Sequence, residues 1–258
     1  MTNIKIGGAE RFSLVDYPNK VAAVVFMQGC PWRCPFCHNH HLQDCAAPTD
    51  FVWEKFMAFL QKRVGVLDAV VFSGGEPLLQ PLALQEKMTE VKQLGYQIGL
   101  HTGGCSPEAF AKVLPLVDWV GFDIKAPFVE AHYQRAMGAK TPLTNVLQSL
   151  DLLLSSGKDY ETRTTCDPRL LSTADIYAIA DSLKDRGVTA YYLQKYRPIP
   201  SDNESTESMC ESFFKDKELL AYLRSCFKTF DIRAEYFFSR YCFYSTSDCC
   251  KKTVIYLS

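Results

Sequence analysis

The amino-acid sequence predicts an α/β fold, namely a partial (β/α)6 TIM-like barrel with an open side, followed by a C-terminal helix and an irregular tail. Short apolar runs rich in β-branched and aromatic residues alternate with segments of helical periodicity. Several helical segments end at a glycine, as at Gly95, Gly157 and Gly187. The alternation occupies about the first three-quarters of the 258 residues, so the barrel has fewer units than a complete one.

The predicted strands and helices follow one another regularly, which indicates a parallel sheet built from right-handed crossover units. The expected strands are residues 21–27, 69–72, 97–101, 119–123, 161–165 and 190–194. The expected helices between them are residues 51–63, 82–94, 107–114, 143–156 and 172–186. The strands are apolar enough to be covered on both faces, as in the wall of a barrel.

The alternation stops after the sixth strand, so we divide the chain into a barrel domain, residues 1–200, and a C-terminal part, residues 201–258. Residues 201–208 are polar and rich in Ser and Glu, which predicts a loop. Residues 211–227 have the apolar spacing of one further helix. The tail, residues 236–258, is rich in aromatic residues and cysteine, and its pattern matches no regular element.

Charge and composition exclude several classes of protein. The 28 basic and 29 acidic residues give a net charge of −1, so we expect neither a nucleic-acid partner nor a membrane partner. The first 20 residues lack the apolar run of a signal peptide, and the longest apolar run, residues 21–27, is too short to cross a bilayer. The 11 cysteines, an odd number, therefore favour a cytoplasmic protein with metal-binding or reactive thiols over a secreted disulfide scaffold.

The strongest local signal is a cluster of three cysteines directly after the first predicted strand. Cys30, Cys34 and Cys37 have the spacing C-x3-C-x2-C. Structural zinc takes four protein ligands, usually in two pairs, and the chain has no second C-x2-C pair. A cubane iron–sulfur cluster also takes four ligands, so three thiolates would leave one iron open to an outside ligand. The spacing thus favours an iron–sulfur cluster that takes part in chemistry, with zinc as the alternative.

Two further polar motifs lie at the ends of predicted strands, where barrels assemble their active sites. Gly74 and Gly75 have no side chains, so the backbone there can approach a ligand closely, and Glu76 follows them. An ordinary turn with a solvated glutamate is the alternative. Asp123 and Lys125 are two residues apart, so both can point toward the same site. A surface ion pair is the alternative for these two residues.

The cysteine motif after the first strand of a partial barrel resembles the radical S-adenosylmethionine (SAM) enzymes. In that family the three cysteines hold a [4Fe–4S] cluster, and SAM binds the fourth iron through its amino and carboxylate groups. An electron from the cluster cleaves SAM to methionine and a 5′-deoxyadenosyl radical, which abstracts hydrogen from unreactive C–H bonds. The resemblance implies that the cofactor carries the radical, so it identifies no catalytic side chain.

The same resemblance implies a set of SAM contacts. The positions that match them are Phe36, Gly74, Gly75, Glu76, Thr102, Asp123, Lys125 and Arg163. Of these, Phe36 corresponds to the aromatic position near adenine, and Glu76 to the acidic position at the SAM amino group. His101 and Gly103 depart from the Asp-Thr-Asn-Gly sequence with which relatives build a monovalent cation site, so the presence of that site is an open question.

The flanks of the cysteine motif resemble one subgroup, the activating enzymes of glycyl radical enzymes. The resemblance covers about residues 5–200 and is strongest to the activating proteins of anaerobic ribonucleoside-triphosphate reductases. Their sixth-strand end matches residues 194–198, which include Tyr196, and pyruvate formate-lyase activating enzymes are also similar. The resemblance implies a glycyl radical enzyme as protein substrate and a flavodoxin or ferredoxin as electron donor.

The remaining cysteines do not have the spacing of a second cluster. Cys45 is the one cysteine between Cys37 and Ser73, so we expect a single cluster, and Cys249 and Cys250 are expected to have no role in it. Two alternatives to the activation of a protein substrate stay open. One is a radical SAM enzyme that acts on a small molecule, and the other is a zinc-stabilised interaction domain.

Overall fold

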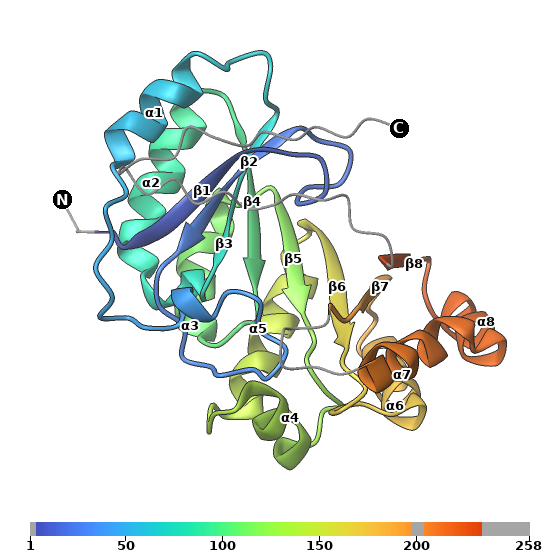
Figure 1. The fold of residues 1–258 in the computed structure, drawn as a ribbon. Coiled ribbons are helices and arrows are strands. Elements are labelled where there is room, and N and C mark those ends of the chain that lie inside the picture. Colours follow the sequence, from blue (N-terminus) through green and yellow to red (C-terminus); the bar gives the residue numbers. More distant parts are fainter. Residues whose placement is uncertain (1–3, 198–203, 234–258) are drawn as a thin grey trace.

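A computed structural model describes residues 4–197 and 204–233 of the chain, and its centre is an eight-stranded sheet (Figure 1). The strands lie in the sheet in the order in which they occur in the chain, from β1 to β8. Their bounds are β1 Ile6–Ser13, β2 Ala22–Met27, β3 Ala69–Gly74, β4 Gln97–Thr102, β5 Trp119–Asp123, β6 Asp159–Cys166, β7 Ala190–Lys195 and β8 Thr229–Arg233.

Strands β2 to β8 are all parallel, which confirms the predicted parallel sheet, and β1 pairs antiparallel with β2. The prediction of six strands is wrong, because β1 and β8 extend the sheet at its two edges. Both are partly exposed and contain polar residues, so neither has the apolar run that marks β2 and β3 in the sequence. Since β1 and β8 do not pair with each other, the sheet stays open, as the partial barrel requires.

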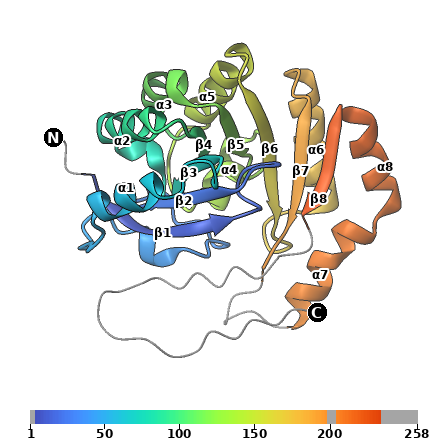
Figure 2. The same ribbon diagram turned by 90° about the horizontal axis from the view of Figure 1, so that it is seen from above.

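Helices cover one side of the curved sheet, and Figure 2 shows α2, α3 and α5 on that side. The α-helices before residue 200 are α1 Trp53–Gln61, α2 Pro81–Gln93, α3 Pro107–Val113, α4 Glu130–Met137, α5 Leu143–Ser155 and α6 Thr173–Asp185. Short 3-10 helices are η1 His40–Leu42, η2 Pro77–Leu79 and η3 Leu114–Leu116. All five predicted helices are present, and α4 is an additional one.

The C-terminal part differs from its prediction. Residues 201–208 are not a loop throughout, because α7 begins at Glu204 and continues to Lys215. The single helix expected at residues 211–227 is wrong as well, because α8 is separate and spans Lys217–Cys226. Asp216 divides the two helices, since its side chain accepts a hydrogen bond from the Leu219 N–H at 2.9 Å and so caps α8. The tail, residues 236–258, lies outside the described residues.

The inner strands form the core because both of their faces are covered. All six residues of β2 are buried, and the apolar residues of β2, β3 and β5 divide between a large cluster that includes the surrounding helices and a small second cluster. Strand register brings the carboxyl ends of the strands to one level, with Met27 opposite Gly74 and Asp123 opposite Arg163. Residues that follow these strands therefore converge at one end of the sheet.

The sheet and its helical cover continue beyond residue 200, where we predicted a domain boundary from the sequence. β8 is parallel to β7, and α8 packs against both α6 and β8. The C-terminal elements are thus joined to the same sheet as the barrel strands. In the described ranges, no helix is long and apolar enough to span a bilayer.

The packing of α8 predicts the effect of shortening one of its side chains. Leu223 is 0% exposed, so Leu223→Ala should lower the free energy of unfolding by about 2–5 kcal/mol through lost burial and the cavity left behind. Urea denaturation measures this change. Leu82→Ala is the matched control, because Leu82 is 58% exposed and its loss should cost less than about 0.5 kcal/mol. Equal effects of the two substitutions would contradict the packing of α8.

Candidate active site

A cavity of about 700 Å³ lies at the carboxyl ends of the parallel strands. Its lining reaches from Leu14, near the N-terminus, to Arg233 at the end of β8. The residues predicted to hold the cluster and SAM all line this one cavity: Cys30, Cys34, Phe36, Cys37, Gly74, Gly75, Glu76, Thr102, Asp123, Lys125 and Arg163. Tyr196 is not part of the lining; it is buried and accepts a hydrogen bond from Arg169 at 2.8 Å.

The three cysteines lie on the cysteine loop, residues 28–39, which follows β2. The Cys37 N–H donates to the Cys34 carbonyl at 3.0 Å, which closes a turn between these two residues, and all three cysteines line the cavity. Burial raises the pKa of the Cys30 thiol to about 12, and burial also raises that of Cys34, against the opposing charge of Lys125. Within the described part of the chain, no three His, Cys, Asp or Glu side chains form a site for a single metal ion.

The segment after α4 holds the cysteine loop in place. The Arg33 N–H donates to the Met137 carbonyl at 2.7 Å, and the Trp32 Nε1–H donates to the Thr141 hydroxyl at 2.8 Å. Gly138 ends α4 with a φ of 60°, and a Cβ there would lie 2.4 Å from the Arg33 carbonyl oxygen. The loop is thus fixed at two points by backbone and side-chain contacts.

The two glycines after β3 allow a close contact between backbones. The Gly75 N–H donates to the Met27 carbonyl at 2.9 Å, and the Glu76 N–H donates to the Gly29 carbonyl at 2.8 Å. A Cβ on Gly75 would lie 2.1 Å from the Gly29 oxygen, and one on Gly74 would lie 2.4 Å from the Met27 nitrogen. These glycines therefore bring the turn after β3 against the start of the cysteine loop.

The side chain of Glu76 connects the end of β3 to the end of β4. It is 2% exposed, and it accepts hydrogen bonds from the Thr102 hydroxyl at 2.7 Å, the Gly103 N–H at 2.9 Å and the Leu78 N–H at 3.1 Å. Burial raises the pKa of this carboxyl, and the three hydrogen bonds oppose the shift. The contact of Glu76 with SAM stays a prediction. Its hydrogen bonds within the chain hold together the ends of β3 and β4, which form the floor of the cavity.

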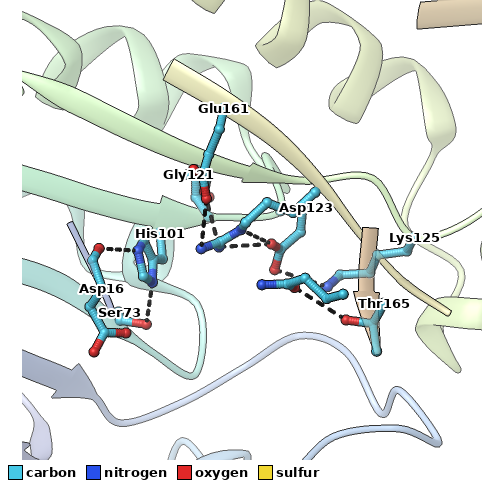
Figure 3. Close-up of polar contacts among 12 residues, drawn as sticks. Asp16, Ser73, His101, Gly121, Asp123, Lys125, Glu161 and Thr165 are labelled. Carbon is cyan, nitrogen blue, oxygen red and sulfur yellow. Dashed lines mark hydrogen bonds and ion pairs between the residues drawn. The ribbon is translucent and has the colours of Figure 1, made fainter. Parts of the chain in front are cut away.

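Asp123 lies between two cations on the cavity wall. Its carboxylate accepts hydrogen bonds from Nε and Nη2 of Arg163 at 3.0 and 2.8 Å, and Lys125 Nζ lies 3.4 Å away (Figure 3). Burial disfavours the ionised form, but Arg163 and Lys125 outweigh it and lower the pKa of Asp123 to about 2. The side chains of Lys125 and Arg163 are only 10% and 7% exposed, so the surface ion pair is the wrong alternative.

Lys125 also connects this wall to the cysteine loop. Its Nζ lies 5.3 Å from the centre of the Trp32 ring and 5.5 Å from that of Phe36. Burial disfavours the charge on Lys125, but Asp123 and Cys34 raise the pKa of its ammonium group, so it stays protonated. The ammonium group thus faces two aromatic rings and a carboxylate beside the cysteines.

His101 occupies the strand end where relatives of the predicted subgroup carry an aspartate. Its Nε2 lies 2.9 Å from the Asp16 carbonyl oxygen and its Nδ1 lies 3.3 Å from the Ser73 hydroxyl (Figure 3). A carbonyl can only accept, so Nε2 carries the proton and Nδ1 accepts from Ser73. Burial and the nearby Arg163 hold the pKa of His101 well below its usual value. His101 therefore contributes no negative charge with which to bind a cation.

Two charged residues next to the cavity, Glu161 and Arg233, were not predicted from the sequence as site residues. Glu161 on β6 lies behind the cavity wall and pairs with Arg233 of β8, Oε2 to Nη2, at 2.6 Å. The alternation along β6 places Glu161 on the same face as Arg163, which is a signal that the sequence does contain. Arg233 had no such signal, because its position depends on the pairing of β8 with β7.

Residues 24–169 match the protein-family model described as the radical SAM superfamily. This span is more than half of the chain and includes the cysteine loop and strands β3 to β6. The chain belongs to the radical SAM superfamily. Enzymes of this superfamily use a [4Fe–4S] cluster and SAM, so these are the cofactors of this radical SAM enzyme.

Relatives of this radical SAM enzyme include two proteins named as activating enzymes. A protein of Methanocaldococcus jannaschii named as a glycyl-radical enzyme activating enzyme is 29% identical over 213 residues, 79% of this chain and 85% of the relative. The pyruvate formate-lyase-activating enzyme of Clostridium pasteurianum is 34% identical over 125 residues, 47% of this chain and 52% of that enzyme. This match therefore spans about half of the length of the second relative.

A solved structure shows the same fold. Streptococcus suis SuiB, crystallised with SAM, superposes with a TM-score of 0.61 at 11% identity, over 83% of this chain and 50% of that one. The likeness shows that most of the chain shares the fold of that structure.

The residues at the cavity fit both cofactors. Cys30, Cys34 and Cys37 lie on one loop and line the cavity, which suits a cubane, because each thiolate there binds a different iron. A cavity of about 700 Å³ is the usual size of a site for a ligand like SAM. Lys125 and Arg163 suit its carboxylate, and Asp123 suits its cationic groups.

The contact between Gly75 and Gly29 predicts that Gly75→Ala strongly destabilises the enzyme. The added Cβ would lie 2.1 Å from a backbone oxygen, so the turn after β3 has to move away from the cysteine loop. We expect a loss of more than about 2 kcal/mol, measured by urea denaturation of the cluster-free protein. Gly95→Ala is the control: its Cβ meets nothing within 4 Å, so it costs only about 1 kcal/mol for its positive φ. A smaller loss for Gly75→Ala than for the control would refute this contact.

The burial of His101 predicts a pH dependence of stability. Below about pH 6.5 the unfolded chain binds a proton on this imidazole, while the folded protein keeps it neutral, so acid destabilises the fold. This contribution is at most about 1.4 kcal/mol per pH unit and disappears above about pH 7. Urea denaturation of the cluster-free protein between about pH 7 and about pH 5 should show a smaller slope in His101→Gln. An equal slope in His101→Gln and in the wild type would contradict the lowered pKa of His101.

Proposed function

We propose that this radical SAM enzyme generates a glycyl radical on a partner enzyme. The observation that carries the proposal is the convergence of the cysteine loop and all predicted SAM contacts on one cavity. Two relatives of the chain described above are named as activating enzymes. When bound, the cluster and SAM supply the carbon radical that removes hydrogen from the α-carbon of a glycine. The chain itself supplies binding, orientation and exclusion of water.

Each predicted residue has a role in this proposal that its surroundings support. Cys30, Cys34 and Cys37 bind the cluster as thiolates, and at Cys34 the ammonium group of Lys125 opposes the effect of burial by favouring the ionised form. Phe36 lies on the same loop and offers an aromatic face for adenine.

The polar residues of the cavity suit a zwitterionic ligand with a sulfonium group. Arg163 and Lys125 orient the carboxylate of SAM, and Asp123 keeps both of them charged. The segment Gly74, Gly75 and Glu76, together with Thr102, forms the side of the cavity next to the cysteine loop, where we place the amino group of SAM. These residues bind and orient SAM, and no catalytic side chain is proposed.

An open side of the barrel suits a protein substrate. Strands β1 and β8 are the two edges of the sheet and do not pair, so a polypeptide loop can approach the cavity between them. A barrel closed by further strands would restrict access to the strand ends. We therefore propose that a glycine-containing loop of the partner enters from this side.

The partner proposed first is the anaerobic ribonucleoside-triphosphate reductase, which is supported by the resemblance of residues 194–198 to activating proteins of that enzyme. Pyruvate formate-lyase is the alternative partner, supported by the name of the Clostridium pasteurianum relative. A flavodoxin or ferredoxin is proposed as electron donor. A cytoplasmic location agrees with these partners.

Electron paramagnetic resonance tests the proposed function directly. The anaerobically reconstituted enzyme is incubated with SAM, a reductant and each candidate partner, and the partner that is the substrate should develop the doublet of a glycyl radical. The doublet arises because one α-hydrogen remains on the glycine. Cleavage of SAM that depends on an added small metabolite, with no radical on either partner, would reject activation in favour of a small-molecule substrate.

Cys34→Ala provides the test of the cluster ligands within the same experiment. Removal of one thiolate should abolish iron binding at the site, the cleavage of SAM and the doublet. Cys226→Ala is the matched control, because Cys226 lies at the end of α8 and does not line the cavity, so it should leave all three unchanged. A reconstituted wild-type protein that holds zinc but no iron or sulfide would exclude the radical mechanism.

A further inference from the structure

A row of five alternating charges crosses the cavity wall from β8 to the end of β5. Its members, in order, are Arg233, Glu161, Arg163, Asp123 and Lys125. The successive separations are 2.6, 3.9, 2.8 and 3.4 Å. Each carboxylate therefore lies between two cations, and Arg163 lies between two carboxylates.

Glu161 depends on Arg233 for its close contact. Its side chain is 2% exposed, and Oε2 accepts from Arg233 Nη2 at 2.6 Å. Its other oxygen, Oε1, is buried without a hydrogen bond and lies 3.9 Å from Arg163 Nη1. A buried carboxylate without a partner is strongly unfavourable, so loss of Arg233 would leave Glu161 in need of another cation.

Arg163 is the cation within reach of Glu161. In the structure its Nε and Nη2 both donate to Asp123 Oδ1, and only its Nη1 is turned toward Glu161. The two carboxylates thus compete for one guanidinium group. Because Arg233 already satisfies Glu161, the guanidinium remains directed at Asp123 and the cavity.

Strand β8 places Arg233 next to Glu161, one of the two carboxylates that compete for Arg163. In the parallel register Arg233 lies opposite Gln194, at the carboxyl end of β7, and its guanidinium group lies 4.9 Å from the centre of the Tyr192 ring. Its side chain is 27% exposed on the cavity side and reaches across β7 to Glu161 on β6. The C-terminal elements therefore contribute a charge to the site itself.

We propose that Arg233 and Glu161 are positioning residues that hold Arg163 in the orientation that binds SAM. This inference rests on the role of Arg163 in the proposed function. Neither residue is proposed to touch SAM, because Arg233 acts through Glu161, and Glu161 lies behind Arg163. The role assigned to β8 is to keep Arg163 paired with Asp123 rather than with Glu161.

The test compares SAM affinity in four variants, measured by calorimetry on anaerobically reconstituted protein. Arg233→Gln should weaken SAM binding about tenfold, because Arg163 turns toward Glu161. Arg233→Lys keeps a cation beside Glu161 and should bind SAM nearly as well as the wild type. Glu161→Gln removes the competing carboxylate, so Arg163 stays on Asp123. The double variant Glu161→Gln/Arg233→Gln should therefore recover affinity to within about threefold of the wild type.

Recovery of SAM affinity in the double variant would distinguish a positioning role of Arg233 from direct contact with SAM and from direct support of the fold. If the double variant binds SAM as weakly as Arg233→Gln, then Arg233 contacts SAM or supports the fold directly, and the proposal is overturned. An unchanged affinity in Arg233→Gln overturns it too. Arg224→Gln is the matched control, because Arg224 lies on α8 and does not line the cavity. Thermal unfolding of each cluster-free variant identifies any loss that comes from the fold alone.

The experiments on these variants and on the wild type show separately whether this inference or the proposed function fails. Failure of the wild-type enzyme to produce a glycyl radical, with normal binding of SAM, would reject the proposed partner class. The order of SAM affinities among the variants would still decide the role of Arg233 and Glu161.

Discussion

The contact between the backbones of Gly29 and Gly75 is the constraint on which the rest of the site depends. It lies where β2 and β3 end side by side, and no side chain separates the two turns. The cysteine loop is therefore held against the segment that carries Glu76. Glu76 continues the connection to β4 through Thr102 and Gly103, so the floor of the cavity is one hydrogen-bonded unit across three strands.

The wall that β5 and β6 form has charge pairs in addition to the backbone hydrogen bonds between its strands. Charges of alternating sign can lie in a protein interior because each has a partner, whereas a single one would be strongly unfavourable. The pairing of Asp123 with Arg163 and Lys125 also keeps all three ionised, as the lowered pKa of Asp123 indicates. Such a wall can present both signs of charge to one ligand. SAM needs that combination, since it carries a carboxylate, an ammonium and a sulfonium group.

The sequence predicted the centre of the fold and the site better than the edges. The three cysteines and Gly74-Gly75-Glu76 are local patterns that need no knowledge of the rest of the chain. Strand β1 lacks an apolar run, α4 is short and largely polar, and the Ser- and Glu-rich start of α7 has the composition of a loop. The pair of Glu161 and Arg233 could not be predicted, because it depends on the register between β7 and β8.

The lining of the cavity extends from Leu14 to Arg233 and draws on residues at the ends of successive strands. No contiguous fragment much shorter than the whole fold contains the complete site. Because synthesis proceeds from the N-terminus, Arg233 on β8 is made after the cysteine loop and after β3 to β7. A truncated chain that retains Cys30, Cys34 and Cys37 but ends before β8 would therefore lack Arg233 and its ion pair with Glu161.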